Sequence, residues 1–114
     1  MNAFTLLHIG INQNSSDEAV SLAAQLSAMF NLNPKHGNKS EFAGTFFECM
    51  KSPYLGTNGH IAMGTADVDA AVFELTEKGY TFNMDTAAYT DDGKLKNIYL
   101  NGEYGGFAIH ILKV

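Results

Sequence analysis

Two histidines occupy equivalent places in two similar segments of the chain. His8 lies in Leu-Leu-His-Ile-Gly-Ile-Asn, and His60 lies 52 residues later in Asn-Gly-His-Ile-Ala-Met-Gly. The same offset places the segment 17–20, Asp-Glu-Ala-Val, on the segment 69–72, Asp-Ala-Ala-Val. Because the match covers more than one histidine, it indicates a duplicated structural unit.

A second alignment, at an offset of 62, places Phe-Glu-Cys-Met-Lys at 47–51 on Ile-His-Ile-Leu-Lys at 109–113 and sets Glu48 opposite His110. Each half therefore contributes one early histidine and one late ligand. Imidazole and carboxylate groups together suit Zn, Ni, Mn or Fe(II). The sequence thus predicts a divalent-metal site made of His8, Glu48, His60 and His110. The alternative is an internally hydrogen-bonded polar cluster in a pocket without metal.

Both halves are predicted to have the order β-α-β-β-β. A strand over 4–12 precedes a helix over about 16–30, whose start is marked by the capping-box pair Ser15 and Glu18. Asp67 and Gly79 mark the ends of the second helix. The remaining predicted strands lie at 41–43, 45–50, 59–64, 80–83, 95–100 and 106–112, and residues 85–94 are predicted to form a polar connection.

Strand alternation predicts which side chains share a face. Leu6, His8 and Gly10 fall on one face of the first strand, and the apolar residues between them suit contact with a helix. The same parity places His60, Glu48 and His110 away from the helices. We therefore expect the four candidate ligands to meet in one concavity.

This pattern resembles the vicinal oxygen chelate superfamily, which includes glyoxalase I, bleomycin resistance proteins and dioxygenases. The resemblance implies an α+β fold in which two βαβββ modules, here about 1–53 and 54–114 of a single domain, form a curved mixed sheet around a cleft. It also implies that the first and last strands of each module supply the metal ligands. Glyoxalase-like members mostly have a carboxylate at the last of these positions, where this sequence has His110.

Several runs are also similar to the C-terminal module of some bacterial 2-dehydro-3-deoxyphosphogluconate/4-hydroxy-2-oxoglutarate aldolases. These runs are Met-Lys-Ser-Pro-Tyr-Leu-Gly at 50–56, Asn-Gly-His-Ile-Ala at 58–62 and Gly-Gly-Phe-Ala-Ile-His at 105–110. The aldol chemistry of that family belongs to a separate barrel with a Schiff-base lysine, for which this chain has no room. Lys51 and Lys113 are expected to extend outward into water. We therefore expect no Schiff-base aldolase activity from this chain alone.

These resemblances favour a metal-dependent lyase or isomerase that acts on a small 2-oxo acid or sugar acid. The metal would polarise the carbonyl, and Glu48 would either ligate it or shuttle a proton. One alternative is a non-catalytic ligand-binding or regulatory module associated with an aldolase. Another is a protein that sequesters a large cationic ligand, as bleomycin resistance proteins do.

Four further residues are assessed by the same reasoning. Tyr54 and Tyr99 are candidate ligand-pocket residues, because a tyrosine hydroxyl can hydrogen-bond a small molecule. His36 lies in a Lys-His-Gly-Asn segment typical of a solvated turn and is left out of the site. Cys49 has the parity of the helix-facing side, which predicts a buried, unreactive thiol.

Composition excludes several other classes of function. Seven lysines, no arginine and a net charge of −5 argue against nucleic-acid binding. The sequence contains no apolar run of membrane-spanning length and a single cysteine, so we expect a cytoplasmic protein without membrane or disulfide chemistry. A homodimer is expected, because members of the resembled fold often pair modules across subunits and an open sheet has exposed edges.

Overall fold

The computed structural model describes all 114 residues, and its elements alternate in the same order in both halves. The first half contains β1 (Thr5–Asn12), α1 (Ser16–Phe30), β2 (Pro34–His36), β3 (Ser40–Ala43) and β4 (Phe47–Met50). The second half contains β5 (Gly59–Thr65), α2 (Val68–Glu77), β6 (Phe82–Tyr89), β7 (Leu95–Leu100) and β8 (Phe107–Lys113). The predicted α+β fold with two βαβββ modules is confirmed.

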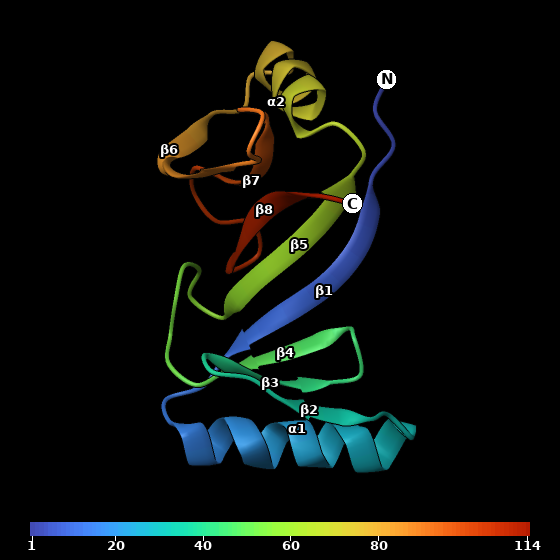
Figure 1. The fold of residues 1–114 in the computed structure, drawn as a ribbon. Coiled ribbons are helices and arrows are strands. Elements are labelled where there is room, and N and C mark those ends of the chain that lie inside the picture. The colour runs from blue at the N-terminus through green and yellow to red at the C-terminus, as the bar shows by residue number, and fades with distance from the viewer.

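All eight strands belong to one mixed sheet with the order β2-β3-β4-β1-β5-β8-β7-β6. The two halves meet where β1 and β5 pair in antiparallel fashion at the centre of the sheet. Each of these strands pairs in parallel on its other side with the last strand of its own half, β1 with β4 and β5 with β8. The first and last strands of both halves therefore lie side by side (Figure 1).

The helices begin where the sequence predicts because local side chains satisfy their first free N–H groups. The Ser15 side chain accepts a hydrogen bond from the Glu18 backbone N–H, and the Asp67 side chain accepts one from that of Ala70. Gly79 follows α2 with a φ of 99°, which suits a residue without a side chain. These contacts place each helix immediately after the first strand of its half.

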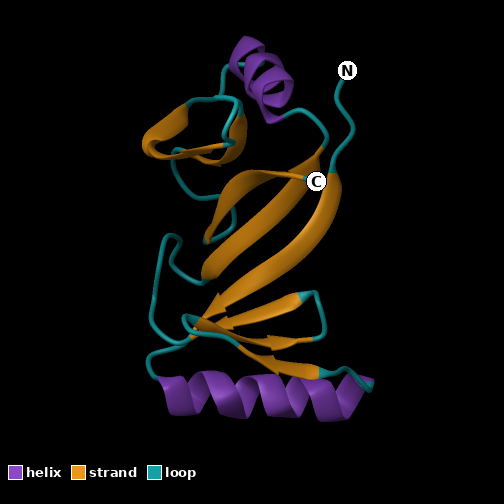
Figure 2. Cartoon of the chain, viewed as in Figure 1, coloured by secondary structure: helices purple, strands orange, loops and turns teal.

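Each helix covers the outer strands of its own half. α1 packs on β2, β3 and β4, and α2 packs on β7 and β8, so the helices lie at opposite ends of the sheet (Figures 1 and 2). The core under α1 is built from Ala19, Ala23, Ala43 and Cys49. The core under α2 is larger in side-chain volume and consists of Val68, Ala71, Leu95, Ile98, Leu100 and Ile111. The two helices thus pack near opposite ends of the sheet. The face of the central strands that points away from the helices is not covered by either helix.

Two local predictions from strand alternation and polarity are wrong. Residues 85–89, predicted to be part of a polar connection, continue β6 to Tyr89. This is tolerated because β6 is an edge strand, so its outer polar groups can reach water. In β1 the register shifts between Leu6, which pairs with Met63, and His8, which pairs with Ala62. Leu6 therefore does not share the face of His8 and Gly10 as predicted, because this irregularity breaks the alternation of side chains along the strand.

Candidate metal centre

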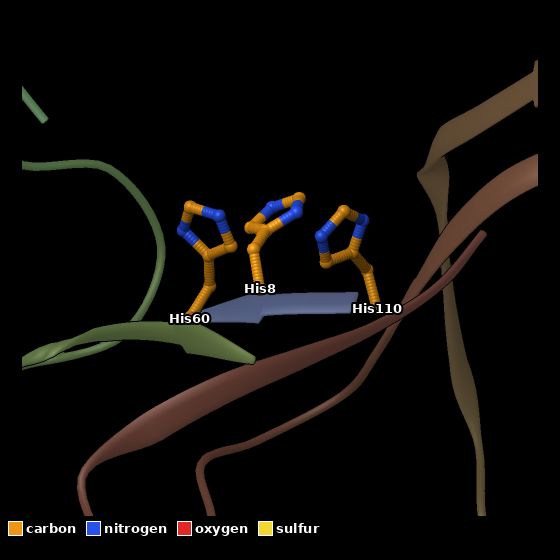
Figure 3. Close-up of side chains that lie close together, drawn as sticks. All are labelled: His8, His60 and His110. Atoms are coloured by element: carbon orange, nitrogen blue, oxygen red, sulfur yellow. The ribbon is translucent and has the colours of Figure 1, made fainter. Parts of the chain in front are cut away.

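The four predicted ligands line one cleft. His8 comes from β1, Glu48 from β4, His60 from β5 and His110 from β8. Figure 3 shows the three histidine rings standing side by side on adjacent strands and pointing the same way. The convergence predicted from strand parity is therefore present in the structure.

Sheet register explains how these side chains meet. Glu48 and His60 are the neighbours of Gly10 on either side, because Gly10 pairs with both. In the next row, Ala62 pairs with both His8 and His110. In each of these two sets of paired residues, a small residue lies between two large polar ones. The small side chain leaves space that the neighbouring polar side chains can occupy.

Gly10 is required by this arrangement. A Cβ atom at position 10 would lie 2.0 Å from Cε1 and 2.3 Å from Nδ1 of His60. These distances are far below van der Waals contact, so the His60 ring occupies the space that any other residue at position 10 would fill. The glycine allows His60 to lie flat against the central strand and toward Glu48.

The side chains of Glu48 and the three histidines lie close together. Glu48 Oε1 lies 3.0 Å from His60 Nε2 and 3.3 Å from His8 Nε2. Ligands that bind one ion at about 2.1 Å are separated by roughly 3.0–3.4 Å for octahedral to tetrahedral angles. One nitrogen from each of His8, His60 and His110 also lies within 4.8 Å of the others. The three histidines therefore form a cluster that could hold a divalent ion, and Glu48 contacts two of them from a neighbouring strand.

Glu48 is held as a carboxylate. Its Oε2 atom accepts a hydrogen bond from Ser40 Oγ at 2.7 Å, while Oε1 faces the two imidazoles. Burial alone would raise the pKa of Glu48, but hydrogen bonds from His60, His8 and Ser40 outweigh it and hold that pKa well below the ordinary value. The site therefore contains one fixed negative charge.

His110 is buried among neutral and aromatic groups. Its Nδ1 atom lies 2.6 Å from Asn97 Oδ1, and the Tyr99 ring stacks on it at a centroid separation of 4.5 Å. Its Nε2 atom is buried without a hydrogen-bond partner, as is Nδ1 of His60. Buried polar atoms without partners are rare in folded proteins, and a nitrogen with a free lone pair is what a metal ion binds.

The environment of His110 makes the metal-free protein sensitive to acid. Burial, together with the nearby His60 and His8, lowers the pKa of His110 from 6.5 to about 4. Below pH 6.5 the unfolded chain therefore takes up a proton that the folded protein does not, so stability falls as the pH falls toward 4. We expect a loss on the order of 2 kcal/mol between pH 6.5 and 5. This loss can be measured as the difference in the free energy of unfolding by urea of the metal-free protein at the two pH values.

The control for this prediction is the exposed His36, whose side chain is 85% accessible. His36→Gln should keep the pH dependence, whereas His110→Gln should reduce it. An unchanged dependence in His110→Gln would show that another group is responsible.

The remaining cleft is large and partly basic. Its volume is about 820 Å³. Tyr54 and Tyr99, the two tyrosines predicted for a ligand pocket, lie in it with their rings 5.9 Å apart. The other residues that line it are Ser16, Asn38, Lys39, Met50, Lys51, Ser52 and Pro53. The cleft therefore offers space for a small organic ligand beside the four donors.

Lys51 does not extend freely into water as predicted. Its Nζ atom lies 3.3 Å from Glu41 Oε2 and donates a hydrogen bond to the Gly37 carbonyl at 2.8 Å. Glu41 is only 3% exposed, and a buried carboxylate needs a cation or hydrogen bonds. No pattern in the sequence indicates that β3 buries an acid, so this ion pair could not be predicted.

The two residues left out of the site are indeed elsewhere. His36 ends the edge strand β2, not a turn as predicted, and its ring contacts Glu41 outside the cleft. Cys49 is fully buried under α1, and burial together with Glu41 and Glu48 raises the pKa of its thiol to about 11. The predicted burial of the thiol is confirmed.

Sequence reasoning missed three residues that shape the site, namely Ser40, Asn97 and the role of Gly10. Asn97 precedes Tyr99 by two positions in β7, so alternation places both on the face that carries His110. Ser40 pairs with Met50 and holds Glu48 from the neighbouring strand. Side-chain alternation along the strands could have placed these residues on the face of the site. Alternation alone, however, does not show which polar side chains contact each other.

No protein-family model and no curated protein sequence matches the chain. Its structure, in contrast, is similar to solved structures over nearly its whole length. A methylmalonyl-CoA epimerase in complex with methylmalonyl-CoA matches with a TM-score of 0.62 and 19% identity, covering 97% of this chain and 95% of the other. Methylmalonyl-CoA epimerase is a member of the vicinal oxygen chelate superfamily. The chain has the vicinal oxygen chelate fold.

Two further structures support this fold. The epimerase from Mycobacterium tuberculosis matches with a TM-score of 0.63 and 15% identity, covering 95% of this chain and 86% of the other. A hypothetical protein from Bacillus halodurans matches with a TM-score of 0.64 and 16% identity, covering 98% and 95%. At these identities the similarity establishes the vicinal oxygen chelate fold alone, and it gives no support to the resemblance to an aldolase module.

In this vicinal oxygen chelate fold, the histidines of β1, β5 and β8 form a cluster that could hold a divalent metal ion. Neither helix of the chain has the length and apolar character needed to cross a lipid bilayer.

Proposed function

We propose that this protein is a metal-dependent isomerase or lyase of the vicinal oxygen chelate type, acting on a small 2-oxo acid or related sugar acid. The ion would be held by His8, Glu48, His60 and His110. The observation that carries the proposal is the convergence of these four donors in one cleft, with a buried His110 Nε2 atom that has no other partner.

The charges of the cleft favour an anionic ligand. A divalent ion bound there would polarise a substrate carbonyl. The donor set supplies only one negative charge, that of Glu48, so a divalent ion would leave the centre with a formal net charge of +1. Lys39 and Lys51 line the same cleft in a chain whose net charge is −5. Lys51 is paired with Glu41, so Lys39 and a bound divalent ion would together make the cleft positive, which suits a carboxylate.

The two tyrosines would bind and orient the ligand. Tyr99 is 6% exposed, and burial raises the pKa of its phenol above the ordinary value, so it stays protonated and could donate a hydrogen bond to a ligand. Tyr54 is 54% exposed and lines the same cleft. A ligand in the cleft would therefore meet one buried and one exposed tyrosine.

Ser40 sets the orientation of Glu48. The Oε2 atom of Glu48 accepts the Ser40 hydrogen bond, and its Oε1 atom lies within 3.3 Å of both His8 and His60. Oε1 is therefore the oxygen that would either ligate the ion or take up a proton from the substrate.

Of the two reaction types, isomerisation is favoured. The solved structures of similar fold include several methylmalonyl-CoA epimerases, and epimerisation is an isomerisation. Moving a proton at the carbon beside a polarised carbonyl also needs a group that takes the proton up and returns it, and Glu48 is the carboxylate in the cleft that could do so. The resemblance of three sequence runs to an aldolase-fused module supports the 2-oxo acid as substrate.

The proposal is tested by elemental analysis of the purified protein, followed by deuterium exchange into pyruvate and 2-oxoglutarate in heavy water. We expect one divalent ion per chain and exchange that requires it. Exchange should disappear after treatment with a chelator and return when the ion is restored. A protein that binds no divalent ion under any condition would contradict the proposal.

The alternative is a non-catalytic ligand-binding or regulatory module, associated with an aldolase. The breadth of the cleft supports it, because about 820 Å³ exceeds what a three-carbon acid fills. The same experiment separates the two functions. Bound metal and ligand without any deuterium exchange would favour the binding module.

We further propose that the chain forms a homodimer. The sheet is open, and its edge strands β2 and β6 have unpaired backbone groups along one side. Pairing of edges between two copies would satisfy them. Sedimentation at micromolar concentration should show a dimer, and a single monomeric species would contradict this.

A further inference from the structure

Asn97 lies behind His110, outside the cleft itself. It is in β7, next to the strand that carries His110, and it does not line the cavity. Its Oδ1 atom is 2.6 Å from His110 Nδ1, a short and well-formed hydrogen bond. Asn97 therefore touches the ligand histidine from the side opposite to the donor cluster and has no access to a bound substrate.

This contact determines which nitrogen of His110 carries its proton. An amide oxygen only accepts hydrogen bonds, so Nδ1 of the neutral imidazole must be the donor. The other nitrogen, Nε2, then has a free lone pair. This is the buried atom without a hydrogen-bond partner, and it is the nitrogen that His110 could offer to an ion held by the histidine cluster. The opposite tautomer would place a hydrogen where an ion must bind.

Tyr99 keeps the ring of His110 in this orientation. The two rings are nearly parallel, with an interplanar angle of 9° and centroids 4.5 Å apart. Tyr99 and Asn97 both belong to β7, and Tyr99 pairs directly with His110 across the sheet. The strand thus supplies a flat surface and a hydrogen-bond acceptor that together restrict both tilt and rotation of the ring.

We propose that Asn97 is a positioning residue that holds His110 with Nδ1 protonated and Nε2 free for metal binding. The role of Asn97 in metal binding rests on the proposed function, because a free Nε2 atom matters only if an ion binds. The predicted tautomer itself, however, belongs to the metal-free protein and can be measured there.

The first test is a long-range ¹H–¹⁵N correlation spectrum of the metal-free protein at neutral pH. We expect Nε2 of His110 at the position of an unprotonated imidazole nitrogen. In Asn97→Leu this signal should shift toward a mixture of tautomers, and in Asn97→Asp, which keeps an acceptor oxygen, it should be retained. A protonated Nε2 in the wild-type protein, or no change in Asn97→Leu, would overturn the inference.

The second test is zinc affinity, measured by competition with a chromophoric chelator. Loss of an outer partner of a ligand histidine weakens metal binding by about 10- to 100-fold. We expect this loss in Asn97→Leu and its rescue in Asn97→Asp. Asn101→Leu, at an exposed asparagine bonded only to Thr81, is the matched control and should bind zinc like the wild type.

The two experiments separate the inference from the proposed function. Absence of binding of any divalent ion by the wild-type protein would contradict the proposed function, while the tautomer measurement would still decide what Asn97 does to His110. Thermal unfolding of each variant shows whether it has folded. An Asn97→Leu variant that is folded and binds zinc with unchanged affinity would overturn the role of Asn97 as a positioning residue.

Discussion

Replacing His60 with alanine should abolish metal binding and any deuterium exchange that depends on it. His60 is 3% exposed and contacts Glu48 at 3.0 Å. Its loss removes one of four proposed ligands and leaves a cavity beside the carboxylate. We expect metal affinity to fall by more than about 100-fold, beyond the effect of losing an outer-sphere partner.

The measurements are metal content by elemental analysis and zinc affinity by competition. His36→Ala is the matched control, because His36 has an 85% exposed side chain outside the cleft. That variant should bind the ion like the wild type. Retention of full metal affinity by His60→Ala would contradict the proposed ligand set, since the other donors would then suffice.

Replacing Gly10 with alanine should damage the site without removing any ligand. The added methyl group would lie 2.0 Å from Cε1 of His60. The ring cannot simply swing aside, because the rings of His8 and His110 have their centroids 5.4 and 5.3 Å from it. Overpacking of this kind costs about 1–3 kcal/mol of stability. We also expect metal affinity to fall by about 100-fold, comparable to the largest outer-sphere effects.

Gly64→Ala provides the control for this prediction. Its methyl group would meet side-chain atoms of Val114 and Leu7, which are apolar and lie outside the metal centre. It should therefore cost stability without changing metal affinity. Urea unfolding and zinc competition on both variants separate the two effects. Equal zinc affinity in the two alanine variants would show that zinc binding by His60 does not require the space that the missing side chain of Gly10 leaves.

Sequence alone determined the features that depend on near neighbours in the chain. Each helix begins after a residue whose side chain accepts a hydrogen bond from the backbone N–H three residues later. These residues are Ser15 and Asp67. The faces of the strands follow from alternation, which placed His8 and His60 on one side. These signals are encoded within a few residues, so the duplicated βαβββ fold and the four proposed ligands could be predicted.

Tertiary structure decided the features that depend on register between distant segments. Alternation did not reveal that Gly10 pairs with both Glu48 and His60, because those residues come from strands far along the chain. It also missed the hydrogen bond from His110 to Asn97 and the buried ion pair of Glu41. A shift of one residue between strands would replace every one of these neighbours while leaving each strand's own pattern intact. Which face a side chain occupies is therefore a local property of the sequence, whereas which partner it meets is set by the packing of the whole sheet.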